Sequence, residues 1–321
     1  KTDYRPVSLL PVFGKILEKL IYDVLYKHLN DHKLLSDKQS GFRKLDSPVN
    51  QLISVTHQIY AAFDQDPPLE VRGVFLDISK AFDKVWHEGL LFKLKRAGIC
   101  GPIIDLICSY LSGRFQRVIL NGAKSSWKPV LAGVPQGSVL GPLLFLLYVD
   151  DLITDFRSDG RLFVDDASLF SIVHDTQTSY NDLMHDLSLI ETWSYQWKMV
   201  FNPDPNKQAV EVIFSTKKMR GCNPPLLFNN SLVQQVEEVK HLGLILDKNL
   251  SFTCHISKLI TKVMKGVGLL RKLRNNVPRD SLLTIYKSFI RPLVDYGDVI
   301  YHSSFGTSSL NKLESSQYQA G

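Results

Sequence analysis

Cysteine is scarce in this chain of 321 residues, which contains only four. The four show neither Cys-x-x-Cys spacing nor a paired histidine, which disfavours a zinc site or a disulfide framework. We therefore expect reduced and mostly buried thiols in an intracellular protein, and the choice between nucleus and cytoplasm stays open.

Long hydrophobic runs are also absent. The longest apolar stretch, residues 139–149, is well short of the roughly 18–20 residues that a membrane-spanning helix needs. The chain does not open on a basic region followed by an apolar run, so we expect no secretory signal. It begins at Lys1 rather than at a methionine, and we expect it to be a fragment of a longer protein.

Positive charge is concentrated in one late segment. Between Lys240 and Arg291 eleven basic residues face only two aspartates, a net charge of +9, while the rest of the chain sums to −3. A basic segment beside an acidic region is typical of a protein that grips a phosphate backbone. A solvated basic helix without a partner is the alternative interpretation.

The hydrophobic pattern predicts an α/β (α+β) body followed by a helical unit. Strand-like runs cover residues 71–76 and 209–215, and residues 116–120 form a third that turns at Asn121-Gly122. A hairpin is expected around Asp165-Asp166. Apolar residues at helical spacing predict helices over residues 13–29, 47–63, 82–96, 103–112, 179–198, 256–273 and 281–289, and another from Pro142.

Three aspartates stand at strand-like runs. Asp77 closes Val71-Arg-Gly-Val-Phe-Leu-Asp77, and Asp165-Asp166 lie between apolar residues in Arg161-Leu-Phe-Val-Asp-Asp-Ala. Carboxylates near a core are costly unless a cation neutralises them, and their oxygens suit Mg²⁺. Two such ions roughly 3.5–4 Å apart can activate a 3′-hydroxyl and stabilise the leaving oxygen of a phosphoryl transfer. The pattern predicts a nucleotide polymerase.

A second Asp pair competes with this assignment. Tyr148-Val-Asp-Asp151 begins only 12 residues after Gln136, and the intervening residues predict the start of an uninterrupted helix. Twelve residues are too few for the chain to finish a helix, cross the sheet and form a hairpin before it reaches the Asp pair. We therefore assign Asp150 and Asp151 to a helix terminus, and Asp165 and Asp166 to the metal site.

Other residues carry weaker signals, each with a structural alternative. Phe82 could stack under a nucleotide sugar, or could simply be a core phenylalanine. Gln136 lies in the glycine loop Gly133-Val-Pro-Gln-Gly-Ser-Val-Leu-Gly-Pro142, which can approach a ligand closely or be an ordinary turn. Lys207 could protonate a departing pyrophosphate, or could be a solvated loop lysine.

These motifs, in this order, resemble the reverse transcriptases of non-LTR (LINE-type) retrotransposons, with the jockey and CR1-like branches most similar. The glycine loop is the most specific of them, and the resemblance covers nearly the whole chain. The other matching stretches are Tyr4-Arg-Pro-Val-Ser-Leu-Leu10, Gln39-Ser-Gly-Phe-Arg43, Phe75-Leu-Asp-Ile-Ser-Lys-Ala-Phe-Asp83, Phe163-Val-Asp-Asp166, Asn202-Pro-Asp-Pro-Asn-Lys207 and His241-Leu-Gly-Leu-Ile-Leu246.

The resemblance implies a right-hand polymerase, with fingers and palm over residues 1–246 and a basic, helical thumb over residues 247–321. It implies that Asp77, Asp165 and Asp166 hold two Mg²⁺ ions, for which Mn²⁺ can substitute. Phe82 would be the sugar gate, Gln136 would contact the nucleotide or template, and Arg43 would touch the triphosphate. The implied partners are an RNA template, a DNA primer and deoxynucleoside triphosphates. An endonuclease region, and some fingers residues, are expected elsewhere in a longer protein.

The sequence departs from the family pattern at two positions. Val164 replaces the more usual alanine before the Asp pair, and Asp150 replaces a common asparagine, which creates the competing motif. Two other hypotheses remain. The chain could be a remnant that binds RNA without polymerising, or a different palm polymerase such as an intron-encoded maturase, which the Ser-Val-Leu-Gly-Pro end of the glycine loop disfavours.

Overall fold

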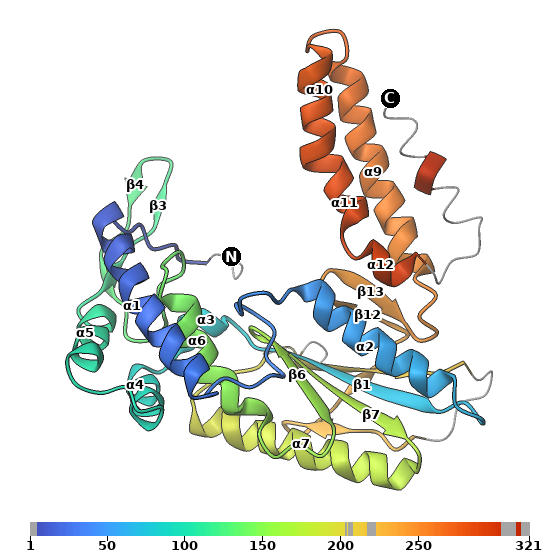
Figure 1. Cartoon of the computed structure of the whole chain (residues 1–321), viewed down its shortest axis with the longest axis horizontal. Helices are drawn as coiled ribbons and strands as arrows, with labels where there is room; N and C mark the ends of the chain where they lie inside the picture. The colour runs from blue at the N-terminus through green and yellow to red at the C-terminus, as the bar shows by residue number, and fades with distance from the viewer. Residues whose placement is uncertain (1–4, 203, 205–207, 217–222, 303–312, 316–321) are drawn as a thin grey trace.

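The computed structural model describes residues 5–202, 204, 208–216, 223–302 and 313–315. Its centre is a five-stranded sheet in the order β11-β8-β1-β7-β6, in which only β11 and β8 run parallel. Figure 1 shows this sheet in the lower half of the molecule. Its strands are β1 (Glu70–Asp77), β6 (Asp159–Phe163), β7 (Asp166–Val173), β8 (Ala209–Phe214) and β11 (Gln234–Gln235).

Strand β1 explains why the sheet lies inside the molecule. Every residue from Glu70 to Leu76 is buried, and only Asp77 at its end is exposed. Alternate side chains point to opposite faces of a strand. Val74 and Leu76 accordingly join one hydrophobic core, and Val71 and Phe75 join another. The sheet thus separates two cores, and its polar end is left facing solvent.

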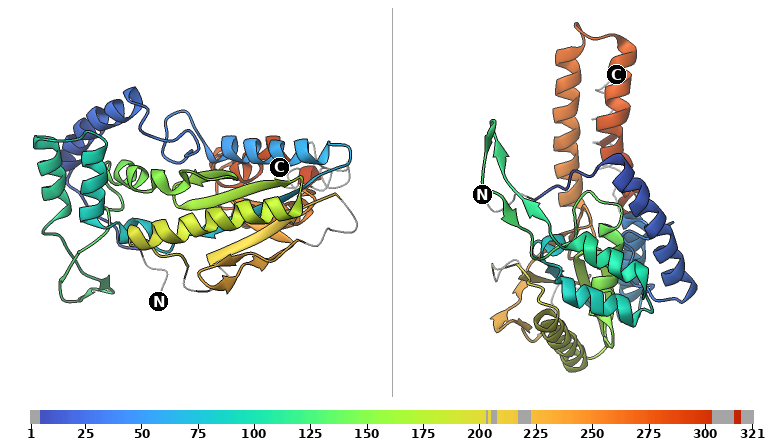
Figure 2. Two further views of the ribbon diagram at one scale, coloured as in Figure 1. Left: turned by 90° about the horizontal axis from the view of Figure 1, so that it is seen from below. Right: turned by 90° about the vertical axis from the view of Figure 1, so that its left-hand side faces the viewer.

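Helices cover both faces of the sheet. Helix α7 (Thr176–Gln196) contributes Leu183 and Leu187 to the core that contains Val74, while α2 (Pro48–Phe63) contributes to the other. Figure 2 shows these two helices on opposite sides of the strands. The remaining helices of the first two-thirds are α1 (Val12–Asp31), α3 (Ala81–Lys84), α4 (His87–Arg96), α5 (Pro102–Leu111), α6 (Gly141–Val149) and the short 3₁₀ helix η1 (Asp150–Ile153).

Short hairpins lie outside the central sheet. The outermost of them turns at Asn121 and Gly122, both with positive φ, as the sequence predicts. Another, β12–β13, follows the central sheet along the chain. The strands are β2 (Phe115–Gln116), β3 (Ile119–Leu120), β4 (Ala123–Lys124), β5 (Lys128–Pro129), β9 (Leu227–Phe228), β10 (Ser231–Leu232), β12 (Glu238–His241) and β13 (Leu244–Asp247).

A helical arm rises from the β12–β13 hairpin (Figures 1 and 2). Its first helix, α9 (Thr253–Leu273), buries Ile256, Leu259, Val263, Val267 and Leu270, the apolar stripe expected from the sequence. The arm continues through α10 (Arg279–Ile285), the π-helical turn η2 (Tyr286–Ile290), α11 (Arg291–Asp295) and α12 (Asp298–Tyr301). The predicted domain boundary at residue 246 stays a prediction.

Most predicted elements are confirmed, some with changes. In α2, within the helix predicted over residues 47–63, the Ser47 hydroxyl accepts a hydrogen bond from the Asn50 amide and Pro48 occupies the first turn. The helix predicted over residues 82–96 is instead two helices, broken at Val85-Trp86, and the strand predicted over residues 116–120 is split between β2 and β3.

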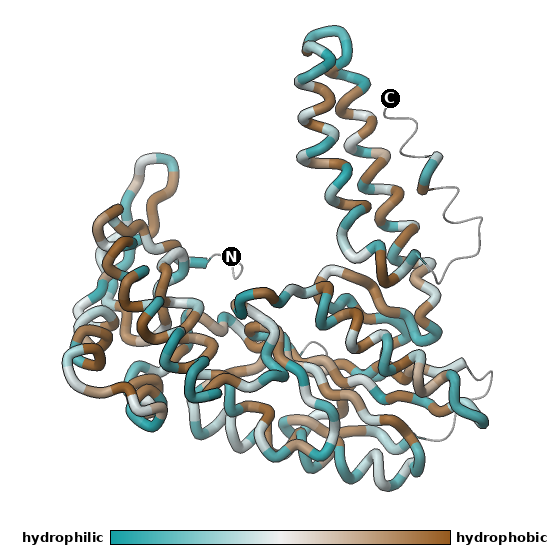
Figure 3. Tube along the Cα trace, in the orientation of Figure 1, coloured by the Kyte–Doolittle hydropathy of each residue, from teal (hydrophilic) through white to brown (hydrophobic). Residues whose placement is uncertain are grey.

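The expectation of mostly buried thiols is wrong for the described cysteines. Cys100 and Cys108 are exposed and Cys254 is half-buried. On helix α1 several apolar residues, among them Ile16 and Leu20, are exposed, and Figure 3 shows that hydrophobic residues recur along this helix. No helix within the described ranges is long and apolar enough to cross a membrane.

Candidate active site

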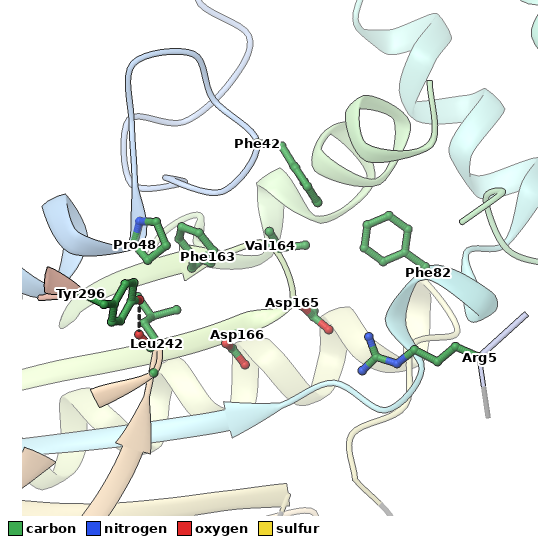
Figure 4. A pocket seen from close by; sticks show the side chains of 11 residues that line it. Arg5, Phe42, Pro48, Phe82, Phe163, Val164, Asp165, Asp166, Leu242 and Tyr296 are labelled. Atoms are coloured by element: carbon green, nitrogen blue, oxygen red, sulfur yellow. Dashed lines mark hydrogen bonds between the residues drawn. The ribbon is translucent and has the colours of Figure 1, made fainter. Parts of the chain in front are cut away.

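The three predicted aspartates converge at one end of the central sheet. Asp77 ends β1 and lies opposite Asp166, the first residue of β7, in the antiparallel register. Asp165 precedes it in the two-residue loop that joins β6 to β7. Asp165 and Asp166 line a pocket of about 430 Å³, shown in Figure 4. Asp77 and Asp166, which are 89 positions apart along the chain (166 − 77), therefore meet because β1 and β7 pair along their whole length.

Burial and neighbouring negative charge raise the pKa values of Asp165 and Asp166. Burial raises the pKa of Asp165 and nearby Asp77 raises it further, against the opposing influence of Arg5. Burial, then the charges of Asp165 and Asp77, raise the pKa of Asp166 to about 6, although its side chain reaches solvent at the pocket mouth. Such clustering of carboxylates favours a bound cation, because a cation would relieve both the desolvation and the repulsion.

In the part of the chain that the structure describes, no group of three histidine, cysteine, aspartate or glutamate side chains is arranged as a metal site. The donor set is nevertheless suited to a hard divalent cation, since it consists of carboxylate oxygens that substrate phosphates could complement. The chemistry of these residues therefore fits Mg²⁺ or Mn²⁺.

Asn202 fixes the orientation of Asp77. Its side-chain amide donates to Asp77 Oδ2 at 2.9 Å, and its backbone N–H donates to the Asp77 carbonyl at 3.0 Å. Because the side-chain bond holds one carboxylate oxygen, the rotamer of Asp77 is restricted. Asn202 opens one of the motifs singled out in the sequence, yet this contact across 125 residues has no local signal.

Arg5 and Phe42 also line the pocket, and neither was among the predicted site residues. Figure 4 shows the Arg5 guanidinium pointing toward Asp165. Arg43, which was predicted to touch the triphosphate, points elsewhere. Its guanidinium donates to the Leu35 and Ser36 carbonyls and pairs with Asp37, and it does not line this pocket.

Lys207, the predicted proton donor for pyrophosphate, lies outside the described residues. Its role therefore stays a prediction.

Phe82 stands in the pocket wall and is also part of the core surface. Its ring stacks on Phe145 with centroids 4.5 Å apart and meets the edge of Phe42 at 6.0 Å. It lines the pocket together with Asp165 (Figure 4). The two interpretations of this residue are therefore compatible, because one face of the ring packs inward while the side chain still borders the space beside the carboxylates.

Gln136 reaches across to the turn that carries Phe82. Its side-chain amide donates to Asp83 Oδ1 at 2.9 Å. The glycine loop is fastened there as well, because the Val134 N–H donates to the Phe82 carbonyl at 2.8 Å. Asp83 is thus an acceptor for the Gln136 side chain. The predicted contact of Gln136 with a nucleotide or template stays a prediction.

The competing Asp pair lies at the end of α6, in η1, as predicted. Asp150 accepts the Ser36 backbone N–H at 3.0 Å, and Asp151 accepts from Lys93 and from the Trp193 indole. Neither residue lines the pocket. The pair therefore joins α6 to the Ser36 turn, α4 and α7, and it serves the packing of the fold.

We expect Asp150→Asn to stabilise the protein at neutral pH. Burial raises the pKa of Asp150 to about 6. Above that pH the folded state carries a buried charge, and below it the folded carboxyl binds a proton before the unfolded one does. The wild type therefore recovers stability as pH falls from about 7 to 4, and the variant does not. Chemical denaturation at pH 7 and pH 4 should show an advantage of the variant that shrinks at the lower pH.

A paired sheet that ends in three carboxylates, beside a glycine loop and a basic helical arm, defines a polymerase of the right-hand class. A family model described as "Reverse transcriptase (RNA-dependent DNA polymerase)" matches residues 1–246. The chain belongs to this reverse transcriptase family, as a domain homologous to the RNA-directed DNA polymerases of non-LTR retrotransposons. Reverse transcriptases generally depend on a divalent metal and use a nucleic-acid template and primer.

Similar proteins come from mobile elements. The chain is 33% identical over 323 residues to the RNA-directed DNA polymerase from mobile element jockey of Drosophila melanogaster, covering 97% of this chain and 34% of that protein. It is 35% identical over 310 residues to the probable RNA-directed DNA polymerase from transposon X-element of the same species, covering 93% and 33%. The chain thus spans about a third of the length of these relatives.

A solved structure shares the fold. Telomerase from Candida albicans, solved in complex with a TWJ fragment of telomeric RNA, superposes with a TM-score of 0.54 at 12% identity, covering 95% of this chain and 54% of that one. The right-hand polymerase fold predicted from the sequence is confirmed.

Proposed function

We propose that this chain synthesises DNA on an RNA template by adding deoxynucleotides to the 3′-hydroxyl of a DNA primer. The observation that carries the proposal is the antiparallel register of β1 and β7, which sets Asp77 opposite Asp166. Asp165 precedes Asp166, and both line the pocket. We propose that these three residues hold two Mg²⁺ ions, for which Mn²⁺ can substitute. When bound, the ions would lower the pKa of the attacking hydroxyl and neutralise charge on the leaving pyrophosphate.

The pocket walls support binding of a deoxynucleoside triphosphate. Arg5 provides a guanidinium facing the carboxylates, and guanidinium groups bind phosphate oxygens through two parallel hydrogen bonds. We propose Arg5 as a triphosphate contact. Phe82 would border the sugar, and Gln136, tied to Asp83, would orient the base or template near it. In this arrangement the protein mainly positions reactants and stabilises charge.

The helical arm supports contact with the template–primer duplex. Lys262 and Lys265 are exposed on α9, outside its buried stripe. Cationic side chains on a solvent face can neutralise backbone phosphates and release bound counterions. We propose that the arm is a thumb that grips the duplex. The endonuclease region expected in a longer protein would lie elsewhere in that protein.

Replacing Phe82 by alanine should weaken discrimination between sugars. The proposed gate excludes a 2′-hydroxyl by contact with the ring, and removal of the ring opens that space. We expect incorporation of ribonucleotides relative to deoxynucleotides to rise roughly tenfold or more, on the scale set by hydrophobic pockets that reject a small group. Single-nucleotide incorporation with matched dNTP and rNTP would measure it, and unchanged selectivity would remove the gate role.

Neutralising two basic residues on α9 should flatten the salt dependence of template binding. In Lys262→Gln/Lys265→Gln, each lost phosphate contact should reduce the slope of log affinity against log salt by about 0.7–0.9. Lys19→Gln/Lys27→Gln on α1 provides a control of equal charge change away from the arm. An arm variant with the wild-type slope would place the grip elsewhere.

The direct test of the proposed function is primer extension by the wild-type chain on an RNA template. We expect DNA product with Mg²⁺ or Mn²⁺ and none after chelation, with activity restored when the metal is returned. RNA binding without extension at any metal concentration would favour the non-polymerising remnant. Extension that persists under chelation would exclude the proposed metal chemistry.

A further inference from the structure

The loop that carries Asp165 begins with a residue in an unfavourable conformation. Val164 has a φ of +61° and is the first of the two residues that join β6 to β7. Two-residue hairpin loops place glycine or asparagine where φ is positive, and a β-branched side chain is disfavoured there. Val164 is also buried. Contacts from a residue outside the hairpin must therefore stabilise the positive φ of Val164.

The side-chain amide of Gln39 holds the turn at Val164. The residue is fully buried, and its Oε1 accepts the Val164 N–H at 3.0 Å and the Gly41 N–H at 2.9 Å. Its Nε2 lies 3.5 Å from the Val164 carbonyl oxygen. Without this oxygen, the Val164 N–H would be buried with no acceptor, which is costly. The side chain thus pairs with Val164 much as a neighbouring strand would.

The backbone around Gln39 reinforces the pairing. Ser40 N–H donates to the Leu162 carbonyl, and Leu162 N–H donates to the Lys38 carbonyl, both at 3.0 Å. These bonds attach the backbone of residues 38–40 to β6 at Leu162, two residues before Val164. The Gln39 side chain adds the next hydrogen bonds in the same direction, at Val164. The segment belongs to the connection between α1 and α2, far along the chain from the hairpin.

Gly41 allows the segment to approach so closely. A Cβ atom at this position would lie 2.4 Å from Val164 Cγ2 and 2.5 Å from Val164 N. No other residue can occupy it without shifting the turn. The next residue, Phe42, lines the pocket. The segment 39–42 therefore touches both the back of the turn and the wall of the site.

We propose that Gln39 is a positioning residue that sets the Val164–Asp165 turn and so aims Asp165 and Asp166 at the reacting atoms. The proposal rests on the proposed function, because it assigns these two carboxylates to catalysis. Loss of the Gln39 oxygen would let Val164 relax toward negative φ, which would rotate the next residue. A displacement of about 1 Å at a reacting centre can cost about 10²-fold in rate.

The test variant is Gln39→Met, which keeps the length and volume of the side chain but removes its hydrogen bonds. We expect the maximal rate of nucleotide incorporation to fall about 10–100-fold, while RNA affinity and the KM for nucleotide change less than about twofold. Gln51→Met is the matched control. Gln51 is a buried glutamine like Gln39. In the part of the chain that the structure describes, neither polar atom of the Gln51 amide has a hydrogen-bond partner, so its replacement removes no such bond.

A second substitution separates positioning from general packing. Glycine adopts positive φ freely, so Val164→Gly removes the backbone strain of the turn but not its need for an acceptor at the N–H of residue 164. The double variant Gln39→Met/Val164→Gly should therefore recover part of the rate lost in Gln39→Met. If the double variant is as slow as Gln39→Met, or if Gln39→Met is as fast as the wild type, the proposal is overturned.

Hydrogen exchange provides a readout independent of activity. The Val164 amide should exchange faster in Gln39→Met than in Gln51→Met, and slow exchange in both would also contradict the proposal. If Gln39→Met does not fold, Gln39→Asn serves in its place, because its side chain is one methylene shorter and its amide oxygen lies farther from the Val164 N–H. A wild type that never extends a primer, but whose turn loosens in Gln39→Met, would count against the proposed function and not against the role of Gln39.

Discussion

Asp165→Asn should abolish nucleotide incorporation while making the protein more stable at neutral pH. The amide cannot supply the negative charge that the proposed metal site needs, and loss of several kcal/mol of charge stabilisation corresponds to at least about 10³-fold in rate. RNA affinity should change little, because the proposed grip depends on the basic arm and not on this carboxylate. Single-turnover incorporation and RNA binding, measured on one preparation, would check both statements.

The expected gain in stability follows from the raised pKa of Asp165. Burial, and then the charge of Asp77, raise that pKa above the value in the unfolded chain. At neutral pH the folded state therefore carries an unfavourable ionised group, which the amide removes. The gain should shrink as pH falls through the folded pKa, because the wild-type carboxyl is then protonated. Loss of activity together with a lower melting temperature would instead indicate damage to the fold.

Gly133→Ala should damage both the fold and the site. Gly133 has a φ of +93°, and a Cβ there would lie 2.8–2.9 Å from backbone atoms of Asp83. Backbone strain and overpacking of this kind each cost about 1–3 kcal/mol. We expect a loss of about 2–5 kcal/mol in the free energy of unfolding, and a fall of more than tenfold in incorporation as the loop moves Gln136 away from Asp83.

A matched variant separates the two causes of that loss. Gly113 also has a positive φ, of +63°, but a Cβ there would meet nothing within 4 Å. Gly113→Ala should therefore show the cost of backbone strain alone and leave incorporation near the wild-type level. Equal effects of the two substitutions on stability and rate would show that the contact with Asp83 is unimportant.

The residues that could be predicted from the sequence are those whose signal is local. Asp77 closes a strand of buried residues, and Asp165-Asp166 interrupt a pattern of strand residues, so antiparallel pairing alone brings them together. The stripe of α9 and the cap at Ser47 were equally readable, because helical spacing and capping chemistry act over a few residues.

Contacts between distant segments could not be predicted in this way. Nothing in the sequence around Asn202 or Arg5 indicates that one holds Asp77 and the other faces Asp165. The Arg43 guanidinium is held by the Leu35 and Ser36 carbonyls in the connection after α1, and the residues around Arg43 give no signal of these contacts. The helix predicted over residues 13–29 is confirmed, but its spacing does not show which apolar residues are covered, since Leu25 and Leu29 are buried while Ile16 is exposed.

The choice between the two Asp pairs is the central claim, and one comparison tests it directly. Asp165→Asn and Asp150→Asn each remove a carboxylate whose pKa is raised by burial, so both should fold and bind RNA. In parallel primer extension on an RNA template with Mg²⁺, we expect wild-type rates from Asp150→Asn and no product from Asp165→Asn. Product from Asp165→Asn, or its loss in a folded Asp150→Asn, would contradict the account.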